Sequence, residues 1–220
     1  MRRRYRKPGS RVRFVVVYSH RPVIGIIGGI GSGKSFVSSM FGELGALVIH
    51  ADANVHAAYQ TDAVKDVLRS WWPGVVRGDG GVDKKAIAVR IFNDAAERKR
   101  LEGLLHPIVN AMRERQMQAA ADDPAVTAFV WDTPLLVETG LHRTCDAVVF
   151  VDAPLEVRLA RVAGRGWEAA ELAKRENSQM PLDNKRRIAD YVISNATDAE
   201  AARRQVRQVL SELQSKSGKP

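Results

Sequence analysis

Cysteine is almost absent from this 220-residue chain, which contains only Cys145. A single thiol cannot form a disulfide within the chain, and together with five scattered histidines it offers no thiolate zinc cluster. Long apolar runs are absent too, since no stretch approaches the roughly eighteen residues needed to cross a bilayer. These absences exclude a membrane-spanning protein and favour a reducing, cytoplasmic compartment.

Acidic residues are missing from residues 1–21, which carry eight of the 34 lysines and arginines of the chain. The other 26 basic side chains face 25 acidic ones, so the formal charge of +9 belongs almost wholly to this segment. The body of the protein therefore gives no electrostatic reason to expect nucleic-acid binding. The segment fits a solvated arm, a targeting peptide or translation from an upstream start, and we expect a disordered extension without a function of its own.

The body opens with a strand, a glycine-rich turn, a helix and a second strand. Residues 23–27 form a nearly continuous apolar run, typical of a strand buried on both faces of a parallel sheet. Apolar residues then recur with helical spacing over residues 36–44, and Gly45 ends the pattern before a second apolar run at 46–49. This order predicts a βαβ unit with a right-handed crossover.

The turn of this unit matches the phosphate-binding pattern G-x-x-x-x-G-K-[ST]. Backbone N–H groups must converge there on phosphate oxygens, in conformations where a Cβ would clash. The lysine of the pattern reaches the β- and γ-phosphates, and the serine hydroxyl ligates Mg²⁺. The dinucleotide pattern G-x-G-x-x-G fails here, which leaves a tight turn with a chance Lys-Ser as the alternative. The predicted phosphate-binding residues are Gly28, Gly29, Ile30, Gly31, Ser32, Gly33, Lys34, Ser35 and Phe36.

Asp52 is the first candidate for phosphoryl-transfer chemistry. The chain has no N-K-x-D guanine signature and no D-x-x-G switch after an apolar strand, which argues against a GTPase. Asp52 follows the apolar run at 46–49, at the edge where ligands bind in open α/β sheets. Its carboxylate suits proton transfer from an acceptor hydroxyl or a metal-bound water, and it equally suits the N-cap of a helix starting near Ala53.

Two later segments place charge beside an apolar pattern. The run at residues 125–131 ends in Asp132, as expected for a strand that brings a carboxylate near a metal, although a turn aspartate would look the same. Arg158, Arg161 and Arg165 share one face of a predicted helix. Phosphoryl transfer needs positive charge over the nucleotide, often from a closing lid, which favours phosphate contact over a solvated charged face.

Residues 53–121 have an almost entirely helical pattern and fit an insert that receives the acceptor. His106 lies off the apolar stripe of this segment, beside Pro107, which must begin or kink a helix. A structural role and substrate contact both remain open for His106. Trp71 and Trp72 fit packing within the insert better than base stacking.

The chain resembles the dephospho-CoA kinase family, the enzymes that complete coenzyme A biosynthesis. The resemblance covers about residues 22–213 and begins with the glycine-rich loop and the string His50-Ala51-Asp52. The later matching elements are more specific than the loop when taken together. They are Leu104-Leu105-His106-Pro107-Ile108, Pro134-Leu135-Leu136-Val137-Glu138, Arg161, Gln179, Lys185, Ala189-Asp190 and Val192-Ile193-Ser194-Asn195.

The resemblance implies ATP-dependent phosphorylation of the ribose 3′-hydroxyl of dephospho-CoA, with Asp52 as the catalytic carboxylate. The chain departs from the family pattern at Phe36, where threonine is usual, and at His50, where a second aspartate is usual. The lid also looks slightly short between Arg165 and Gln179. None of these departures touches the lysine and serine of the loop or the catalytic carboxylate, so we expect activity to survive.

These observations predict an α/β, three-layer P-loop NTPase fold with a parallel sheet, a helical substrate-binding insert and a short lid. The predicted parts are a basic extension (1–21), core (22–52), a helical acceptor-binding region (53–121), core (122–160), a lid (161–187), and core with a C-terminal helix (188–220).

The predicted function is ATP-dependent phosphorylation of dephospho-CoA, with ATP and Mg²⁺ as cofactors. We expect small-molecule substrates and no nucleic acid or membrane as partners, and the sequence does not predict the oligomeric state. The alternatives are a kinase for another small hydroxyl acceptor and a nucleotide-dependent nucleic-acid-binding module. By role, the other predicted site residues are Lys34 and Arg161 (catalytic, with Asp52), Arg158, Arg165 and Asn195 (ATP), His106, Pro134 and Leu135 (substrate), and Ser35 and Asp132 (metal, Asp132 through water).

Overall fold

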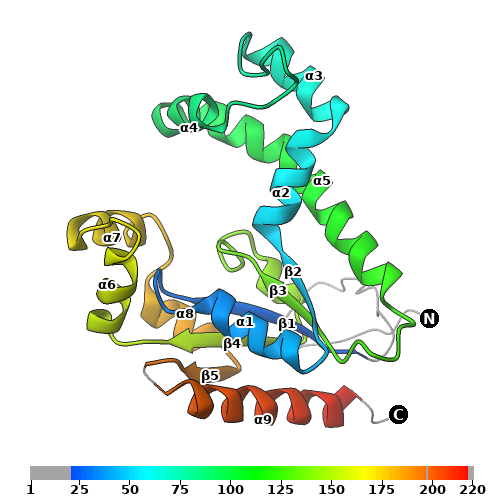
Figure 1. Ribbon diagram of the computed structural model, residues 1–220, viewed down its shortest axis with the longest axis vertical. Coiled ribbons are helices and arrows are strands. Elements are labelled where there is room, and N and C mark those ends of the chain that lie inside the picture. Colours follow the sequence, from blue (N-terminus) through cyan, green and yellow to red (C-terminus); the bar gives the residue numbers. More distant parts are fainter. Residues whose placement is uncertain (1–20, 197, 218–220) are drawn as a thin grey trace, which may run out of the picture. The chain divides into compact units, whose positions relative to one another are not determined.

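The structure, a computed structural model, describes residues 21–196 and 198–217, so most of the basic extension lies outside the described residues. The chain divides into two compact units, one formed by residues up to Ile49 together with those from Met117 onward, and one formed by His50–Gln116. The first unit contains a five-stranded sheet with the strand order β2-β3-β1-β4-β5 (Figure 1). Its strands are β1 (Val23–Gly28), β2 (Leu47–His50), β3 (Phe129–Asp132), β4 (Ala147–Asp152) and β5 (Tyr191–Ser194).

The sheet is parallel wherever its register is defined. β1 pairs in parallel with β3 on one side and with β4 on the other, and β4 pairs in parallel with β5. The predicted parallel sheet is therefore confirmed. The helices of this unit are α1 (Lys34–Glu43), α6 (Leu155–Ala163), α7 (Ala169–Glu176), α8 (Leu182–Ile188) and α9 (Ala199–Ser217), with a 3₁₀ helix at Leu141–Thr144.

Helices cover both faces of the sheet, which gives the predicted three layers. Ile24 and Ile26 of β1 point to the face covered by α1 and α9, whereas Val23 and Ile27 point to the face that packs against α8. All six residues of β1 are buried, because side chains of both parities meet a helical layer. This burial explains the continuous apolar run in the sequence.

The apolar run that ends at Asp132 is longer than the strand it predicts. Only Phe129–Asp132 forms β3, because the residues before it make a turn. The Asp123 carboxylate accepts a hydrogen bond from the N–H of Ala125 at 2.9 Å, and the N–H of Val126 bonds back to the Asp123 carbonyl. An aspartate that bonds to the backbone two residues further on is a common turn former.

Two close contacts secure the first strand and the end of a long helix. A Cβ on Gly25 of β1 would overlap Leu136 and come within 2.9 Å of the Cys145 sulfur, so only glycine fits beneath that thiol. Arg21 donates to the carbonyls of Ala120 and Ala121 at 2.7 and 2.5 Å and also to that of Asp123. A cation at these carbonyls complements the C-terminal end of the helix that precedes them.

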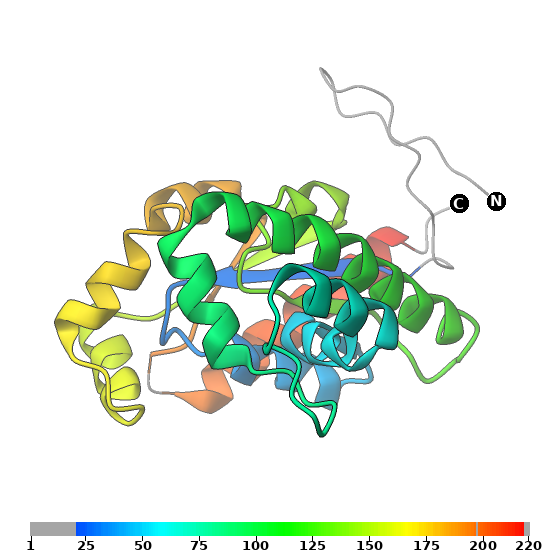
Figure 2. The same ribbon diagram turned by 90° about the horizontal axis from the view of Figure 1, so that it is seen from above.

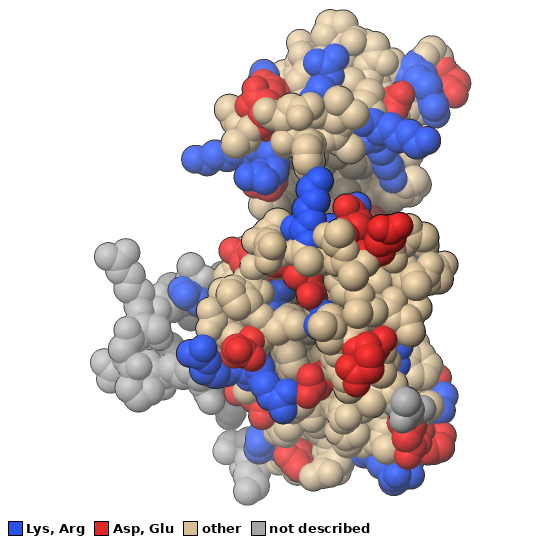
Figure 3. Space-filling model, turned by 90° about the vertical axis from the view of Figure 1, so that its left-hand side faces the viewer, with Lys and Arg blue, Asp and Glu red and all other residues tan. Residues whose placement is uncertain are grey.

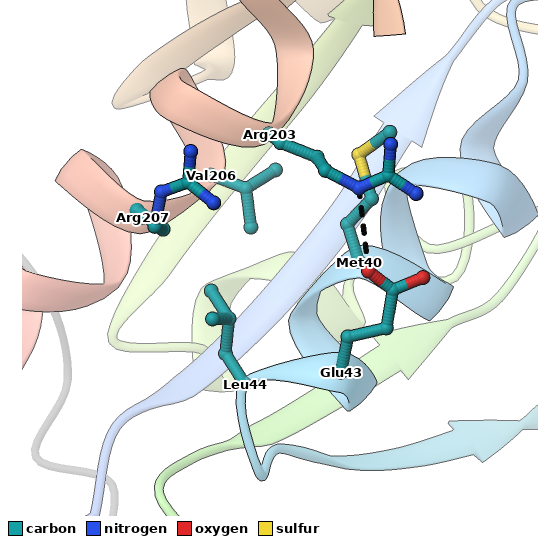
Figure 4. Close-up of a pocket in the computed structure, with 6 residues that line it drawn as sticks. All are labelled: Met40, Glu43, Leu44, Arg203, Val206 and Arg207. Carbon is teal, nitrogen blue, oxygen red and sulfur yellow. Dashed lines mark hydrogen bonds and ion pairs between the residues drawn. The ribbon is translucent and has the colours of Figure 1, made fainter. Parts of the chain in front are cut away.

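α9 packs along α1 on the outer face of the sheet. Arg203 of α9 pairs with Glu43 of α1, with 3.4 Å between Nε and Oε2 (Figure 4). The cavity beside this pair has a volume of only about 20 Å³, enough for about one water molecule. It is a packing defect rather than a substrate site, and its lining residues are Met40, Glu43, Leu44, Arg203, Val206 and Arg207.

The second unit is helical (Figure 2). Its buried apolar residues form a core of their own. Trp72 is 4% exposed in this core, and its Nε1 donates to a Glu97 carboxylate oxygen at 2.8 Å. The Trp71 ring packs edge-on against the Trp72 ring at 5.9 Å between centroids, which confirms the packing interpretation of this pair. The unit comprises α2 (Ala51–Gln60), α3 (Asp62–Trp71), α4 (Lys84–Asn93) and most of α5 (Ala95–Ala119).

Pro107 lies inside α5 and does not begin a helix, contrary to one of the two expectations for it. Among the described helices, none combines the length and the apolar character that crossing a bilayer requires.

Candidate active site

The glycine-rich loop joins β1 to α1, where the sequence pattern places it. Gly33 is the N-cap of α1 with a φ of 87°, and Gly31 has a φ of 77°, both in the left-handed region that favours glycine. A Cβ on Gly31 would lie 2.8 Å from the carbonyl oxygen of Arg158, so the loop is also packed closely against α6. The loop thus presents backbone N–H groups beside a helix N-terminus, an arrangement that binds phosphate.

Lys34 begins α1 and turns back over the loop. Its Nζ donates to the carbonyls of Gly28 and Gly29 at 3.2 and 2.9 Å. Burial lowers the pKa of Lys34 to about 8, and the positive charge of Lys185 lowers it further, whereas the charge of Asp132 acts in the opposite direction. The Lys34 amine therefore lies in an electropositive, partly dry position that a phosphate would neutralise.

Arg161 of α6 connects two loops by hydrogen bonds to four carbonyl oxygens. Its Nη1 donates to Gly31 and Ser32 in the glycine-rich loop, at 3.3 and 3.1 Å. Its Nη2 donates to Asn195 and Ala196 after β5, at 2.9 and 3.1 Å. The structure thus places Arg161 at the loop, with its guanidinium bonded to the protein backbone.

Asn195, the residue after β5, contacts the same loop. Its Nδ2 donates to the carbonyl of Ser32 at 2.7 Å, and a Cβ on Gly33 would overlap that same nitrogen. Asn195 is 4% exposed, and its own N–H bonds to the Asp152 carbonyl at the end of β4. The carboxyl end of the sheet therefore helps to shape the glycine-rich loop.

Ser35 and Asp132 are the candidate metal ligands in this unit. Ser35 lies in the first turn of α1, and Asp132 is the last residue of β3, opposite Ile26 of the neighbouring strand β1. Among the described residues, no group of three or more histidine, cysteine, aspartate or glutamate side chains is placed to hold a metal. A hydroxyl and a carboxylate are ligands that suit Mg²⁺, which keeps several waters and takes its other ligands from phosphates.

Comparison with known proteins agrees with this geometry. The family model described as dephospho-CoA kinase matches residues 22–201. The chain belongs to the dephospho-CoA kinase family. This family catalyses the final, ATP-dependent step of coenzyme A biosynthesis.

The relatives match over most of their length. A dephospho-CoA kinase of Anaeromyxobacter dehalogenans (strain 2CP-C) is 39% identical over 201 residues, which cover 90% of this chain and 94% of that protein. The crystal structure of TT1252 from Thermus thermophilus matches with a TM-score of 0.77 and 32% identity, over 89% of this chain and 99% of that one. Dephospho-CoA kinase from Campylobacter jejuni has the same fold, with a TM-score of 0.66 at 24% identity and coverage of 88% and 98%.

The two single-residue departures from the dephospho-CoA kinase pattern lie at exposed positions. Phe36, the third residue of α1, is 43% exposed, and His50 is the exposed N-cap residue of α2. Because α2 begins at Ala51, Asp52 lies within its first turn and is not its N-cap, so the capping interpretation of Asp52 is wrong. The Asp52 carboxylate is exposed to solvent.

The remaining predicted residues lie in different parts of the chain. Pro134 and Leu135 are exposed just after β3 in the first unit, whereas His106 is exposed on α5 in the second unit. Arg165 lies just beyond the end of α6, and its charge acts to lower the pKa of Lys34, which places it on the same side as the loop.

Sequence reasoning assigned no role to Lys185, although this residue carries part of the dephospho-CoA kinase resemblance. Lys185 is 2% exposed, and its Nζ lies 2.9 Å from both a Gln179 and a Glu138 side-chain oxygen. Burial acts to raise the pKa of Glu138, but hydrogen bonds from Lys185 and from the Met180 N–H outweigh it and leave this pKa below its usual value. The only sequence signal for a role of Lys185 was its place among the family-specific residues. Its partners, Gln179 and Glu138, are known only from the fold.

Arg158 and Glu176 form a second pair that the sequence did not reveal. Arg158 was predicted at the phosphates, and its Nη1 lies 2.5 Å from Oε1 of Glu176 at the end of α7. The same carboxylate oxygen accepts a hydrogen bond from the N–H of Ile30 in the glycine-rich loop at 3.3 Å. No pattern in the sequence marks Glu176, because its two partners are 18 and 146 residues away.

Proposed function

We propose that this chain transfers the γ-phosphoryl group of ATP to the ribose 3′-hydroxyl of dephospho-CoA, giving coenzyme A and ADP. The observation that carries the proposal is a complete phosphate-binding loop, with Lys34 turned over it, in a member of the dephospho-CoA kinase family. The alternative is that the chain is a kinase for another small-molecule acceptor. The acceptor that it phosphorylates distinguishes the two functions.

The residues around the loop account for the electrostatic part of the reaction. Negative charge spreads over the transferred phosphoryl group in the transition state. We assign stabilisation of that charge to Lys34, which is buried beside the loop, and to the backbone N–H groups of the loop. Arg158 and Arg165 are the further arginines that we assign to phosphate contact.

We assign the metal to Ser35 and, through water, to Asp132. Mg²⁺ supplies charge neutralisation and orientation of the phosphate oxygens when it is bound. Asp132 is 9% exposed, so its side chain is largely shielded from bulk water.

Asp52 is the proposed general base for the acceptor hydroxyl, with His106, Pro134 and Leu135 as proposed acceptor-binding residues. Asp52 comes two residues after the end of β2 along the chain, and it is exposed and is not the N-cap of α2. The carboxylate would accept the hydroxyl proton, or orient that hydroxyl, as it attacks the γ-phosphorus.

A paired measurement tests this function. Asp52→Asn should lose on the order of 10² to 10⁴ in turnover, the usual contribution of a positioned base, while its affinity for ATP changes little. Turnover is followed as ADP release with dephospho-CoA, adenosine, AMP and shikimate, and ATP affinity is followed by calorimetry. Full turnover in Asp52→Asn would reject the catalytic role, and preference for another acceptor would reject the substrate assignment.

The expected partners and compartment follow from the proposed reaction. Small-molecule substrates suffice for this reaction, and we expect neither nucleic acid nor membrane to take part. Figure 3 shows acidic and basic side chains interspersed on the displayed face, which is unlike the basic stripe of a nucleic-acid-binding surface. A biosynthetic enzyme family and a single free cysteine favour the cytoplasm.

A further inference from the structure

Glu176 places one carboxylate oxygen on the glycine-rich loop. Its Oε1 accepts a hydrogen bond from the Ile30 N–H at 3.3 Å and lies 2.5 Å from Nη1 of Arg158. A Cβ on Gly29 would come within 3.2 Å of the same oxygen. The carboxylate is thus seated directly against the first half of the loop.

The partners of this oxygen are those that a phosphate oxygen takes. A loop of this kind binds phosphate through backbone N–H groups, and arginine binds phosphate through its planar fork. The Arg158 side chain is 8% exposed, so its charge is largely withdrawn from water and needs an anionic partner in the fold. Glu176 supplies that anion.

Glu176 also borders open space. With residues 177 and 179–182, it lines a cavity of about 270 Å³ between α7 and α8. The Glu176 side chain is 22% exposed, so its carboxylate has room to leave the loop toward this cavity. Its charge also acts on Lys34, whose pKa it tends to raise, as a bound phosphate would.

We propose that Glu176 occupies the position of a phosphate oxygen on the loop and must leave when a nucleoside triphosphate binds, so that it lowers the affinity of the chain for ATP. Two anionic groups cannot share one N–H and one guanidinium without strong repulsion. ATP binding therefore includes the free-energy cost of displacing the carboxylate, and Arg158 passes from Glu176 to the phosphates. The proposal rests on the proposed function in that the loop binds ATP.

A role for Glu176 in helping ATP to bind predicts the opposite change in affinity. If Glu176 instead orients Arg158 for ATP, removal of the carboxylate weakens ATP binding. The direction of the change in affinity thus decides between competition and positioning.

The test is calorimetric titration of the full chain and its Glu176→Gln and Glu176→Ala variants with ATP, tripolyphosphate and adenosine. We expect both variants to bind ATP and tripolyphosphate about tenfold more tightly than the unchanged chain, because no charge-assisted contact must be broken first. Adenosine, which has no phosphate, should bind all three proteins equally. Urea unfolding verifies that each variant is folded, and the alanine variant provides the comparison if the glutamine variant is not.

Glu171→Gln is the matched control, since Glu171 lies on α7 and pairs with Arg175 on the exposed side. It removes the same charge from the same helix and should leave the affinity for ATP unchanged. Unchanged or weaker ATP binding in both Glu176 variants would overturn the proposal while leaving the kinase assignment intact. If the unchanged chain binds ATP but does not phosphorylate dephospho-CoA, the function fails and the affinities still decide the role of Glu176. No ATP binding by any variant would overturn both.

Discussion

Lys34 is the residue whose protonation state the structure ties most directly to phosphate binding. Burial, and then Lys185, bring its pKa to about 8. Because kcat/KM reports the free enzyme, kcat/KM for ATP should fall as the pH rises through about 8, when the amine loses its charge. kcat at saturating ATP should persist to higher pH, since bound phosphates favour the charged amine. Steady-state kinetics between about pH 6.5 and 10 measure both.

Lys34→Arg is the control for this assignment. Arginine keeps its charge throughout that range, so the variant should be slower overall but lack the decline near pH 8. A decline that survives in Lys34→Arg would assign the titration to another group. The effect of Lys34 on stability runs in the other direction from its effect on activity. The unfolded lysine keeps its proton to about pH 10.5, whereas the folded one loses it near pH 8. The free energy of unfolding should therefore rise as the pH increases from about 8.

Arg161 is expected to affect folding as well as turnover. Arg161→Ala leaves four carbonyls without this donor and should lower the free energy of unfolding by about 2 kcal/mol while raising the KM for ATP. The free energy of unfolding and the KM of Arg161→Lys should lie between those of the unchanged chain and of Arg161→Ala, because one ammonium cannot reach both loops. Urea unfolding beside steady-state kinetics checks this. A loss of kcat with an unchanged free energy of unfolding would instead mean that Arg161 acts only on ATP.

At the level of elements, the glycine-rich loop and α6 behave as one packed part. Gly31→Ala introduces a Cβ 2.8 Å from the Arg158 carbonyl at a φ of 77°, so the loop must move away from α6. We expect about 2 kcal/mol of lost stability and at least about tenfold weaker ATP binding.

Gly103→Ala is the matched substitution in α5, where a Cβ meets nothing within 4 Å. It should stabilise the chain by up to about 1 kcal/mol through helix propensity and leave ATP binding unchanged. The two variants are compared by urea unfolding and calorimetry. Equal effects would mean that the packing of the loop against α6 is unimportant.

Elements whose signal is local were predictable from the sequence. The loop motif, the buried strand at 23–27 and the helix after it each depend on neighbouring residues, and the structure confirms them. The start of β3 was placed too early, because apolar residues 125–128 conceal the turn made by Asp123. Apolar content alone does not distinguish a strand from a turn that packs beside it.

Contacts between distant segments could not be predicted in this way. Arg161 was placed near ATP, but its bonds to the glycine-rich loop join residues about 130 positions apart and depend on how α6 returns to the sheet. The contacts of the buried Lys185 with Gln179 and Glu138 likewise form only when α8 packs on the sheet. Periodicity reports which face of a helix is buried but not which polar atoms meet there.

At the scale of the whole molecule, the uneven charge predicts a separable extension. Deleting residues 1–20 should leave turnover unchanged and make binding to DNA or RNA negligible at physiological salt, because residues 21–220 carry a formal charge of only +2. Fluorescence anisotropy with a labelled oligonucleotide measures the binding. Strong binding by the shortened chain would restore the nucleic-acid alternative.

Deleting residues 1–21 is the comparison, because it also removes Arg21 and its hydrogen bonds to the carbonyls that follow α5. The longer deletion should lower the free energy of unfolding by about 1 kcal/mol relative to the shorter one. Equal stability of the two would show that these hydrogen bonds contribute nothing measurable.

Because Cys145 lies against Gly25 of β1, chemical labelling of its thiol can report transient opening of this part of the chain. Cys145 is half-buried, with its sulfur close to β1, so a bulky alkylating reagent should react faster when that region opens, and the change in labelling rate follows the open population. Because no other thiol exists in the sequence, one mass increment reads the event without any engineered probe. If this opening also disrupts the loop that follows β1, ATP at ten times its Kd should slow labelling about tenfold, since ligand protects only the closed form. A labelling rate that does not change with ATP would mean that the opening occurs on the side of the strand away from the nucleotide.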